Sequence, residues 1–357
     1  MKSLVKSNDV RFTATRKRPI VFSLFLAASL FVLVAGISGA VYEFSWEWVE
    51  ARRYPPPGVM VNVGGHQMHV FCTGQGGPTV VLCSGLGLPS LSWGLVQPQI
   101  SQITRVCSYD RAGYAWSEPG PKPRTTLQIV TELHQLLDTA KIPKPYIIVG
   151  HSFGGFVARL YSTLYPQQVA GVVLVDASNE DTMAMLPAKM KAAELRRMQL
   201  EQFLPYVGYF GIPRIRRAIF GLGQAGRSSP RFPEPLLREM TSLMLWARSF
   251  GPFVDEINHI LESGEQVRRA GKLGDVPLTV ITASRLDDVP DGIDRSDFYN
   301  WEGIRVNRLQ NQLAQLSTRG RRIVVHDSSH MILGQDPEAV SDAVKEMVYR
   351  LRRERSN

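Results

Sequence analysis

Cysteine is scarce in this sequence, and several patterns that bind metals or phosphates are missing. The 357 residues include only three cysteines, and no group of His and Cys residues has the spacing of a zinc site. We find no glycine-rich phosphate-binding loop, no internal repeat and no long low-complexity tract. The sequence therefore predicts neither a metal nor an organic cofactor. With 44% hydrophobic and 20% charged residues, its composition excludes a fibrous or disordered protein.

Acidic residues are also the minority, and the net charge is +9. Much of the basic excess lies at the two ends of the chain. The residues concerned are Lys2, Lys6, Arg11, Arg16, Lys17, Arg18, Arg350, Arg352, Arg353 and Arg355. No nucleic-acid-binding motif accompanies them, so we expect no nucleic-acid partner. The C-terminal group is typical of the solvated end of a last helix, where the helix dipole favours cations.

Charged residues are absent from residues 20–41, a run of Phe, Leu, Val and Ala. At about 1.5 Å per residue, such a helix is long enough to cross a hydrocarbon core of about 30 Å. The basic residues before it predict a cytoplasmic N-terminus and an extracytoplasmic remainder. Ser38-Gly39-Ala40 resembles a signal-peptide cleavage site, so secretion after cleavage is the alternative. We favour a retained signal-anchor, and both interpretations export the rest of the chain.

The remaining sequence divides into segments of different character. The predicted parts are a basic segment at 1–19, a transmembrane helix at 20–41, a proline-rich linker at 42–58, a core of alternating strands and helices at 59–178 and 275–357, and a helical cap at 179–274. Within the linker, residues 51–58 are expected to form a stiff spacer and not a helix. In the core, the alternation predicts a mostly parallel sheet covered by helices on both faces.

The pentapeptide Gly150-His151-Ser152-Phe153-Gly154 lies between a predicted strand at 146–149 and a predicted helix at 154–165. This is the form of a nucleophile elbow, a strained turn that raises a serine hydroxyl above the sheet. Gly150 and Gly154 are needed because side chains there would crowd the turn. Ser152 is therefore the predicted nucleophile, and His151 is expected to shape the turn.

These features resemble the α/β-hydrolase family over residues 61–352. The resemblance implies an eight-stranded, mostly parallel sheet flanked by helices, with the helical cap inserted after strand 6. Ser84-Gly85-Leu86-Gly87 is similar to the family's oxyanion loop, with Ser84 in place of the usual histidine. The resemblance implies that the main-chain N–H groups of Leu86 and Phe153 form the oxyanion hole. The segment 110–117, DRAGYAWS, is similar to a structural turn of the family.

The same resemblance places the strands at 68–73 and 105–109 side by side. It thereby implies a disulfide between Cys72 and Cys107, which an exported protein can form. The alternative is two buried thiols. Cys83 is then left unpaired, at the end of a buried strand.

A serine hydroxyl needs a base within hydrogen-bond reach and an acid that orients the base. His330 follows the last predicted strand, at 322–326, and matches the family's histidine loop. His326, within that strand, is the weaker candidate, and His259 is expected to serve packing or to lie on the surface.

The acid stays open between two places. The family most often carries it after the strand at 277–283, where Asp287, Asp288 and, slightly further on, Asp291 stand. Asp176, at the end of the preceding strand at 171–175, is the rival, because some members of the family carry the acid there.

The resemblance implies hydrolysis of a small-molecule or lipid carboxylic ester through an acyl-enzyme. A serine at position 152 argues against dehalogenase or epoxide-hydrolase chemistry. Family members with those activities carry an aspartate as the nucleophile of the elbow. The alternatives are a membrane-associated lipase, an acyltransferase and, in another class, a non-catalytic ligand-binding protein on the same fold.

Overall fold

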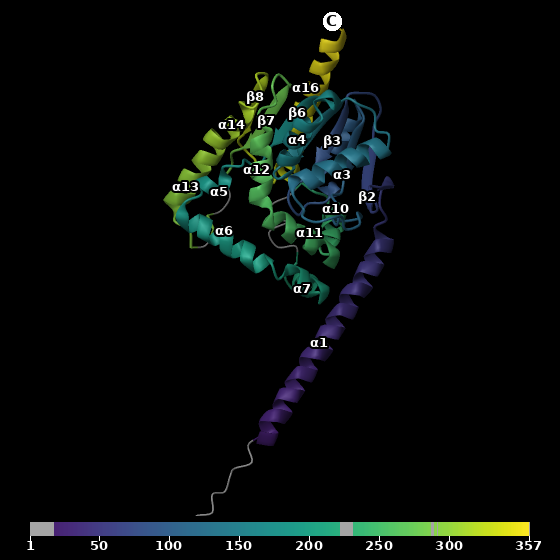
Figure 1. Ribbon diagram of the computed structural model, residues 1–357, viewed down its shortest axis with the longest axis vertical. Helices are drawn as coiled ribbons and strands as arrows, with labels where there is room; N and C mark the ends of the chain where they lie inside the picture. The colour runs from purple at the N-terminus through teal and green to yellow at the C-terminus, as the bar shows by residue number, and fades with distance from the viewer. Residues whose placement is uncertain (1–17, 222–230, 287–288, 291, 357) are drawn as a thin grey trace, which may run out of the picture.

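An eight-stranded sheet forms the centre of the part of the chain that the computed structural model describes, residues 18–221, 231–286, 289–290 and 292–356 (Figure 1). The strands are β1 (Val59–Asn62), β2 (Gln67–Thr73), β3 (Thr79–Cys83), β4 (Val106–Tyr109), β5 (Tyr146–His151), β6 (Val169–Val175), β7 (Leu278–Ala283) and β8 (Gly320–Val325). Their order is β1-β2-β4-β3-β5-β6-β7-β8. β2 runs antiparallel to both neighbours, and every pairing from β4 to β8 is parallel. The predicted sheet is confirmed.

Helices cover both faces of this sheet, which explains why its central strands are continuous apolar runs. On β5, Ile148 packs toward one face, whereas Ile147 and Val149 pack toward the other. The first face is covered by α3 (Thr126–Thr139), α4 (Gly154–Leu164), α12 (Ile260–Ala270) and α14 (Gln310–Ala314). The second face is covered by α2 (Gln97–Ser101) and α16 (Pro337–Ser356).

The segment between β6 and β7 is helical, as predicted for a cap inserted after the sixth strand. It contains α5 (Thr182–Met185), α6 (Ala188–Glu201), α7 (Leu204–Tyr209), α8 (Ile212–Phe220), α10 (Glu234–Met244), α11 (Ala247–Asn258) and α12. The last helix of this segment, α12, is part of the core, because its Val267 is buried in the hydrophobic cluster on the first face of the sheet. A helical stretch that the sequence analysis did not assign lies between β7 and β8: α13 (Arg295–Gly303), a π-helical turn (Ile304–Leu309) and α14. The short α15 (Ile332–Gln335) precedes α16.

The first helix, α1 (Arg18–Arg53), is longer than the predicted membrane segment. Its stretch Val21–Arg53 is long and apolar enough to cross a membrane, and its most apolar window has a mean hydropathy of 2.4 and is uncovered by the rest of the protein. The helix continues through residues 42–53, where a linker was expected. Of the stretch 51–58, which was expected not to be helical, residues 51–53 are the last turn of α1. Glu43 and Glu50 of α1 form buried ion pairs with Arg214 of α8, which hold this part of the chain against the cap.

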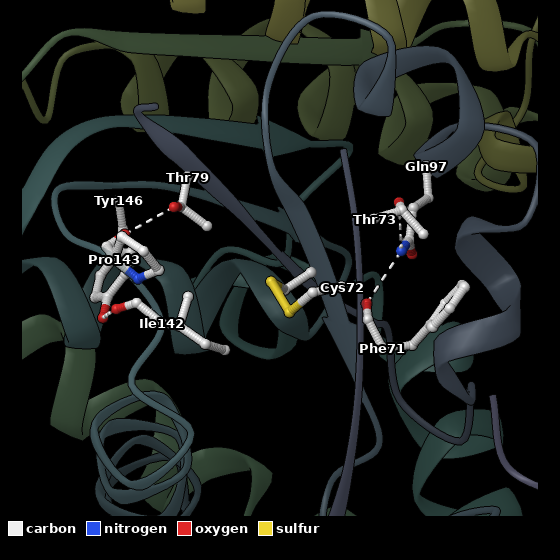
Figure 2. Close-up of a disulfide and its surroundings, with 9 residues drawn as sticks. Phe71, Cys72, Thr73, Thr79, Gln97, Ile142, Pro143 and Tyr146 are labelled. Carbon is white, nitrogen blue, oxygen red and sulfur yellow. Dashed lines mark hydrogen bonds between the residues drawn. A yellow bond between two sulfur atoms is a disulfide. The ribbon is translucent and has the colours of Figure 1, made fainter. Parts of the chain in front are cut away.

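Cys72 on β2 stands directly opposite Cys107 on β4, and the structure joins the two in a disulfide (Figure 2). Beside it, the Gln97 amide donates hydrogen bonds to the Phe71 carbonyl at 3.0 Å and the Thr73 hydroxyl at 3.2 Å. Cys83 is a buried free thiol, and burial raises its pKa to about 12. It is therefore an unreactive packing residue.

Candidate active site

Ser152 occupies the turn between β5 and α4 in a left-handed conformation, with φ of 52°. A serine rarely adopts this conformation, and it persists only where its surroundings enforce it. Here the Ser152 N–H donates to the Val175 carbonyl at 3.1 Å, and the Ser152 carbonyl accepts from the Gly155 and Ser178 N–H groups at 2.9 and 3.0 Å. These three main-chain bonds tie the turn to the first residues of α4, to the end of β6 and to the segment that follows β6.

The glycines on either side of this turn have no room for a side chain. A Cβ on Gly150 would overlap the main chain of Gly154, and a Cβ on Gly154 would overlap the carbonyl of Cys83. A Cβ on Gly155 would likewise overlap the Cβ of Ala177, so glycine at this position lets α4 approach the sheet. The steric reason for the glycine pattern is therefore present in the structure.

The structure brings His330 and Asp176 to Ser152. His330 follows β8 in the chain, and its Nε2 lies 3.0 Å from Ser152 Oγ. Its Nδ1 lies 2.7 Å from Asp176 Oδ2, at the end of β6. Asp287, Asp288 and Asp291 lie outside the described residues. Of the acids considered from the sequence, Asp176 is the one whose position relative to His330 is described.

Asp176 is buried and receives four hydrogen bonds at its carboxylate. Besides His330, the Ala283 N–H donates to its Oδ1 at 3.1 Å, and Nη1 of Arg305 lies 3.0 Å from both oxygens. Burial raises the pKa of Asp176, but the hydrogen bond from His330 and the charge of Arg305 lower it more, and the pKa falls to about 2. Asp176 is therefore an anion at neutral pH, as an orienting acid must be.

Arg305 was not identified from the sequence. It lies in the π-helical turn between α13 and α14, where its Nη2 also donates to the Ala283 carbonyl at 3.1 Å and its Nε to Glu302 at 2.9 Å. These contacts hold the guanidinium beside the acid. Glu302 and Arg305 are three residues apart, the spacing of a helical ion pair, but this spacing does not reveal that the arginine reaches Asp176.

His151 connects the nucleophile turn to the histidine loop. Its Nε2 donates to the main-chain carbonyl of His330 at 2.9 Å, and the two rings lie 5.0 Å apart. Burial, together with the nearby His330, lowers the pKa of His151 to about 4. The neutral ring thus supports the loop that carries His330, in addition to its predicted role in shaping the turn.

Leu86 and Phe153 line one cavity together with Ser152. Among the described residues, no hydrogen-bond acceptor is found for the N–H group of either one. The loop before Leu86 is held by Arg111, which donates to the carbonyls of Ser84 at 2.7 Å and Gly85 at 3.0 Å. The guanidinium is buried and also pairs with Glu256 of α11 at 2.8 Å, so the cap contributes to the position of this loop. The DRAGYAWS turn supplies Arg111.

Two cavities meet at Ser152. The larger, about 190 Å³, is mostly apolar, and its lining includes Leu86, Phe156, Met183, Met198, Ile257 and Ile260. The smaller, about 160 Å³, is more polar, and its lining includes Asn179, Thr182, Arg305 and Gln310. Gln310 donates to the Ala177 carbonyl at 2.9 Å, whereas its buried Oε1 has no partner among the described residues.

Possible metal ligands do not cluster near this site in the part of the chain that the structure describes. In the described residues, no group of three or more His, Cys, Asp and Glu side chains is placed to hold a metal ion. His326 contacts the Ser284 hydroxyl at 3.0 Å, and His259 contacts the Asp255 carbonyl at 2.8 Å. Neither histidine is hydrogen-bonded to Ser152.

Comparisons with known proteins agree with this architecture. A family profile described as "Alpha/beta hydrolase family" matches residues 80–343. An AB hydrolase superfamily protein of Gibberella zeae is 24% identical over 281 residues, which cover 76% of this chain and 86% of that protein. The protein YqjL of Bacillus subtilis is 32% identical over 130 residues, which cover 36% of this chain and 51% of YqjL.

Other similarities are shorter in sequence or show the fold alone. Three curated relatives at 26–32% identity, YqjL among them, are matched over only 20%, 51% and 48% of their length. The crystal structure of an enol-lactonase from Burkholderia xenovorans superimposes with a TM-score of 0.58 and 19% identity, covering 81% of this chain and 99% of that one. From the profile match and the eight-stranded sheet, we conclude that the chain belongs to the alpha/beta hydrolase family.

Proposed function

We propose that this protein hydrolyses carboxylic esters through an acyl-enzyme, with Ser152 as nucleophile, His330 as base and Asp176 as the orienting acid. The observation that supports this most is the unbroken hydrogen-bond chain from Ser152 Oγ through both ring nitrogens of His330 to a buried, ionised Asp176. In this arrangement the proton on Nδ1 faces the carboxylate, and Nε2 is free to accept the serine proton.

The proposed reaction has two halves. Ser152 Oγ attacks the ester carbonyl as His330 takes its proton, and the N–H groups of Leu86 and Phe153 stabilise the oxyanion. His330 then returns the proton to the departing alcohol, which leaves an acyl group on Ser152. In the second half, His330 activates water, the acyl group leaves as the carboxylic acid, and Ser152 regains its proton.

The two cavities suggest how an ester would be held. The apolar cavity suits the acyl chain, because it is lined by Leu, Phe, Met and Ile side chains next to the nucleophile. The polar cavity suits a hydroxylated alcohol, because its lining includes the polar side chains of Asn179, Thr182 and Arg305. We therefore propose esters of an aliphatic acid with a polar alcohol. An acyltransferase would use the same residues with an alcohol in place of water.

We further propose that α1 is a single-pass anchor with its N-terminus in the cytoplasm. The apolar stretch of α1, which the rest of the protein does not cover, supports the anchor, and the basic residues that precede residues 20–41 support this orientation. The Cys72–Cys107 disulfide suits an extracytoplasmic body.

A fluorophosphonate probe tests the hydrolase proposal, because it reacts with activated serines. We expect the full chain to be labelled at Ser152, and Ser152→Ala to lose both labelling and ester turnover. Ser356→Ala, an exposed serine of α16, is the matched control and should keep both. If the wild-type protein is neither labelled nor active on short or long esters, a ligand-binding role replaces this proposal.

A further inference from the structure

Exposed apolar side chains gather on two cap helices beside α1. We call Phe203, Tyr206, Tyr209, Ile215, Ile219 and Phe220 the α7–α8 apolar face; their exposed fractions run from 42% for Ile215 to 74% for Phe220. A soluble surface rarely exposes so many large apolar residues together, and such a patch marks a surface that contacts a partner or a membrane.

The helix α8 is amphipathic. Ile212, Ile215 and Ile219 recur at the helical spacing and are exposed, whereas Arg214 points to the opposite side and is buried. Arg216, between the isoleucines, is exposed. A short helix with an apolar outer face and arginines beside it is typical of segments that lie in the headgroup layer of a membrane.

Contacts with α1 fix where this face lies. The main-chain oxygen of Phe210 would stand 2.5 Å from a Cβ on Gly39, so the turn before α8 lies directly against the end of the apolar run. One turn further along α1, Glu43 receives two hydrogen bonds from Arg214, at 2.9 and 3.0 Å, and Glu50 receives one at 2.6 Å. The α7–α8 apolar face therefore lies next to the C-terminal end of the apolar stretch of α1.

The same helical layer forms the roof of the proposed active site. Met198 and Arg197 of α6 line the apolar cavity over Ser152, and α6 leads directly into α7. In Figure 1, α6 and α7 lie along the edge of the body from which α1 projects, and the end of α16 lies at the opposite edge. An ester in the bilayer would meet this layer first.

We infer that the α7–α8 apolar face inserts into the lipid bilayer in which α1 is anchored, and that the ester substrate is drawn from that bilayer. This inference rests on the proposed anchoring and ester hydrolysis, and it identifies the substrate as a membrane lipid ester. Insertion places the outer isoleucines and aromatic rings among acyl chains, Arg216 among lipid phosphates, and the Arg214 ion pairs on the sheltered side against α1.

Site-directed fluorescence on the full chain tests the insertion. Variants with one added cysteine, Ile219→Cys and Tyr349→Cys, are labelled with bimane; Cys72 and Cys107 are held in the disulfide, and Cys83 is a buried thiol. The protein is reconstituted in phosphatidylcholine–phosphatidylglycerol vesicles that contain a brominated phosphatidylcholine. Tyr349 is the matched control, because it is 44% exposed and belongs to α16, the helix whose end lies at the opposite edge of the body in Figure 1. We expect strong quenching by brominated lipid at 219 and little at 349, with the reverse order for aqueous iodide.

Two results would overturn the inference. Equal quenching by brominated lipid at both positions would mean that the face stays above the bilayer. Protection of position 219 from both quenchers would mean that protein, such as a second copy of this chain, covers it.

A kinetic arm separates failure of this inference from failure of the proposed function. Ile215→Asp/Ile219→Asp should keep turnover of a short soluble ester but lose roughly tenfold on a long-chain monoester dispersed in the same vesicles. Equal activity of variant and wild type on both substrates would contradict membrane uptake, whereas a wild type inactive on both would contradict ester hydrolysis itself.

Discussion

Replacing Asp176 by Asn changes one atom of the proposed acid and should nearly abolish turnover. The oxygen of the new amide would face the donors on the Oδ1 side, the Ala283 N–H at 3.1 Å and Arg305 at 3.0 Å. Its NH₂ group would then stand at the Oδ2 position, 2.7 Å from His330 Nδ1. Nδ1 of His330 would then accept a hydrogen bond from this NH₂ group, and the ring proton would move to Nε2. Nε2 could no longer take the proton of Ser152.

We expect kcat/KM to fall by about four orders of magnitude, equivalent to ~5 kcal/mol of transition-state stabilisation. The assay is initial-rate hydrolysis of a short p-nitrophenyl ester, with circular dichroism and thermal unfolding to verify that the variant is folded. Asp287→Asn and Asp288→Asn are matched controls that should stay near wild type. A folded Asp176→Asn variant within about tenfold of wild type, or a greater loss in either control, would refute this assignment of the acid.

Three further predictions concern residues around this site and the sheet. Arg305→Gln should lower kcat roughly ten- to a hundredfold with little change in KM, and Arg305→Lys should recover part of the loss; unchanged kinetics would exclude a positioning role. The pKa of His151 is about 4 in the native protein, against an ordinary value of 6.5. Between these two pH values, the unfolded chain therefore binds a proton at His151 that the native protein does not bind. The free energy of unfolding should therefore fall by about 3 kcal/mol as the pH drops from about 6.5 to about 4, and His151→Gln should flatten this part of the curve in urea titrations. Cys72→Ser/Cys107→Ser opens a loop with a sequence separation of 35 and should lower the free energy of unfolding by about 3–4 kcal/mol; an unchanged denaturation midpoint would contradict this.

The nucleophile turn could be predicted because its requirements are local. Gly150 and Gly154 must lack side chains wherever a strand turns this sharply into a helix, so five consecutive residues carry the signal. The acid could not be assigned from the sequence for the opposite reason. Parallel strands deliver their carboxyl ends to one edge of the sheet, so from the sequence alone an acid after either of two neighbouring strands is a candidate partner of His330. Distance along the chain does not tell which carboxylate reaches His330.

Arg305 and the docking of α1 were missed for two different reasons. The stretch around Arg305 includes a π-helical turn, which breaks the 3.6-residue spacing by which helices are recognised in a sequence. In contrast, Glu43, Glu47 and Glu50 recur at helical spacing, and this pattern does indicate that the helix continues past residue 41. Their partners, Arg214 and the Ala247 N–H, lie more than 150 residues away and could be identified only in the folded chain.

The unbroken length of α1 has a consequence for how the protein would meet its substrate. Its 36 residues extend for about 54 Å, well beyond a hydrocarbon layer of about 30 Å, and its upper part is clamped to the cap by buried charges. In the proposed anchored state, the body could not swing as on a flexible tether, so the helix would set its height and tilt above the lipid. Encounters would then be confined to two dimensions, and turnover would follow the mole fraction of ester within the membrane and not its amount per volume of solution.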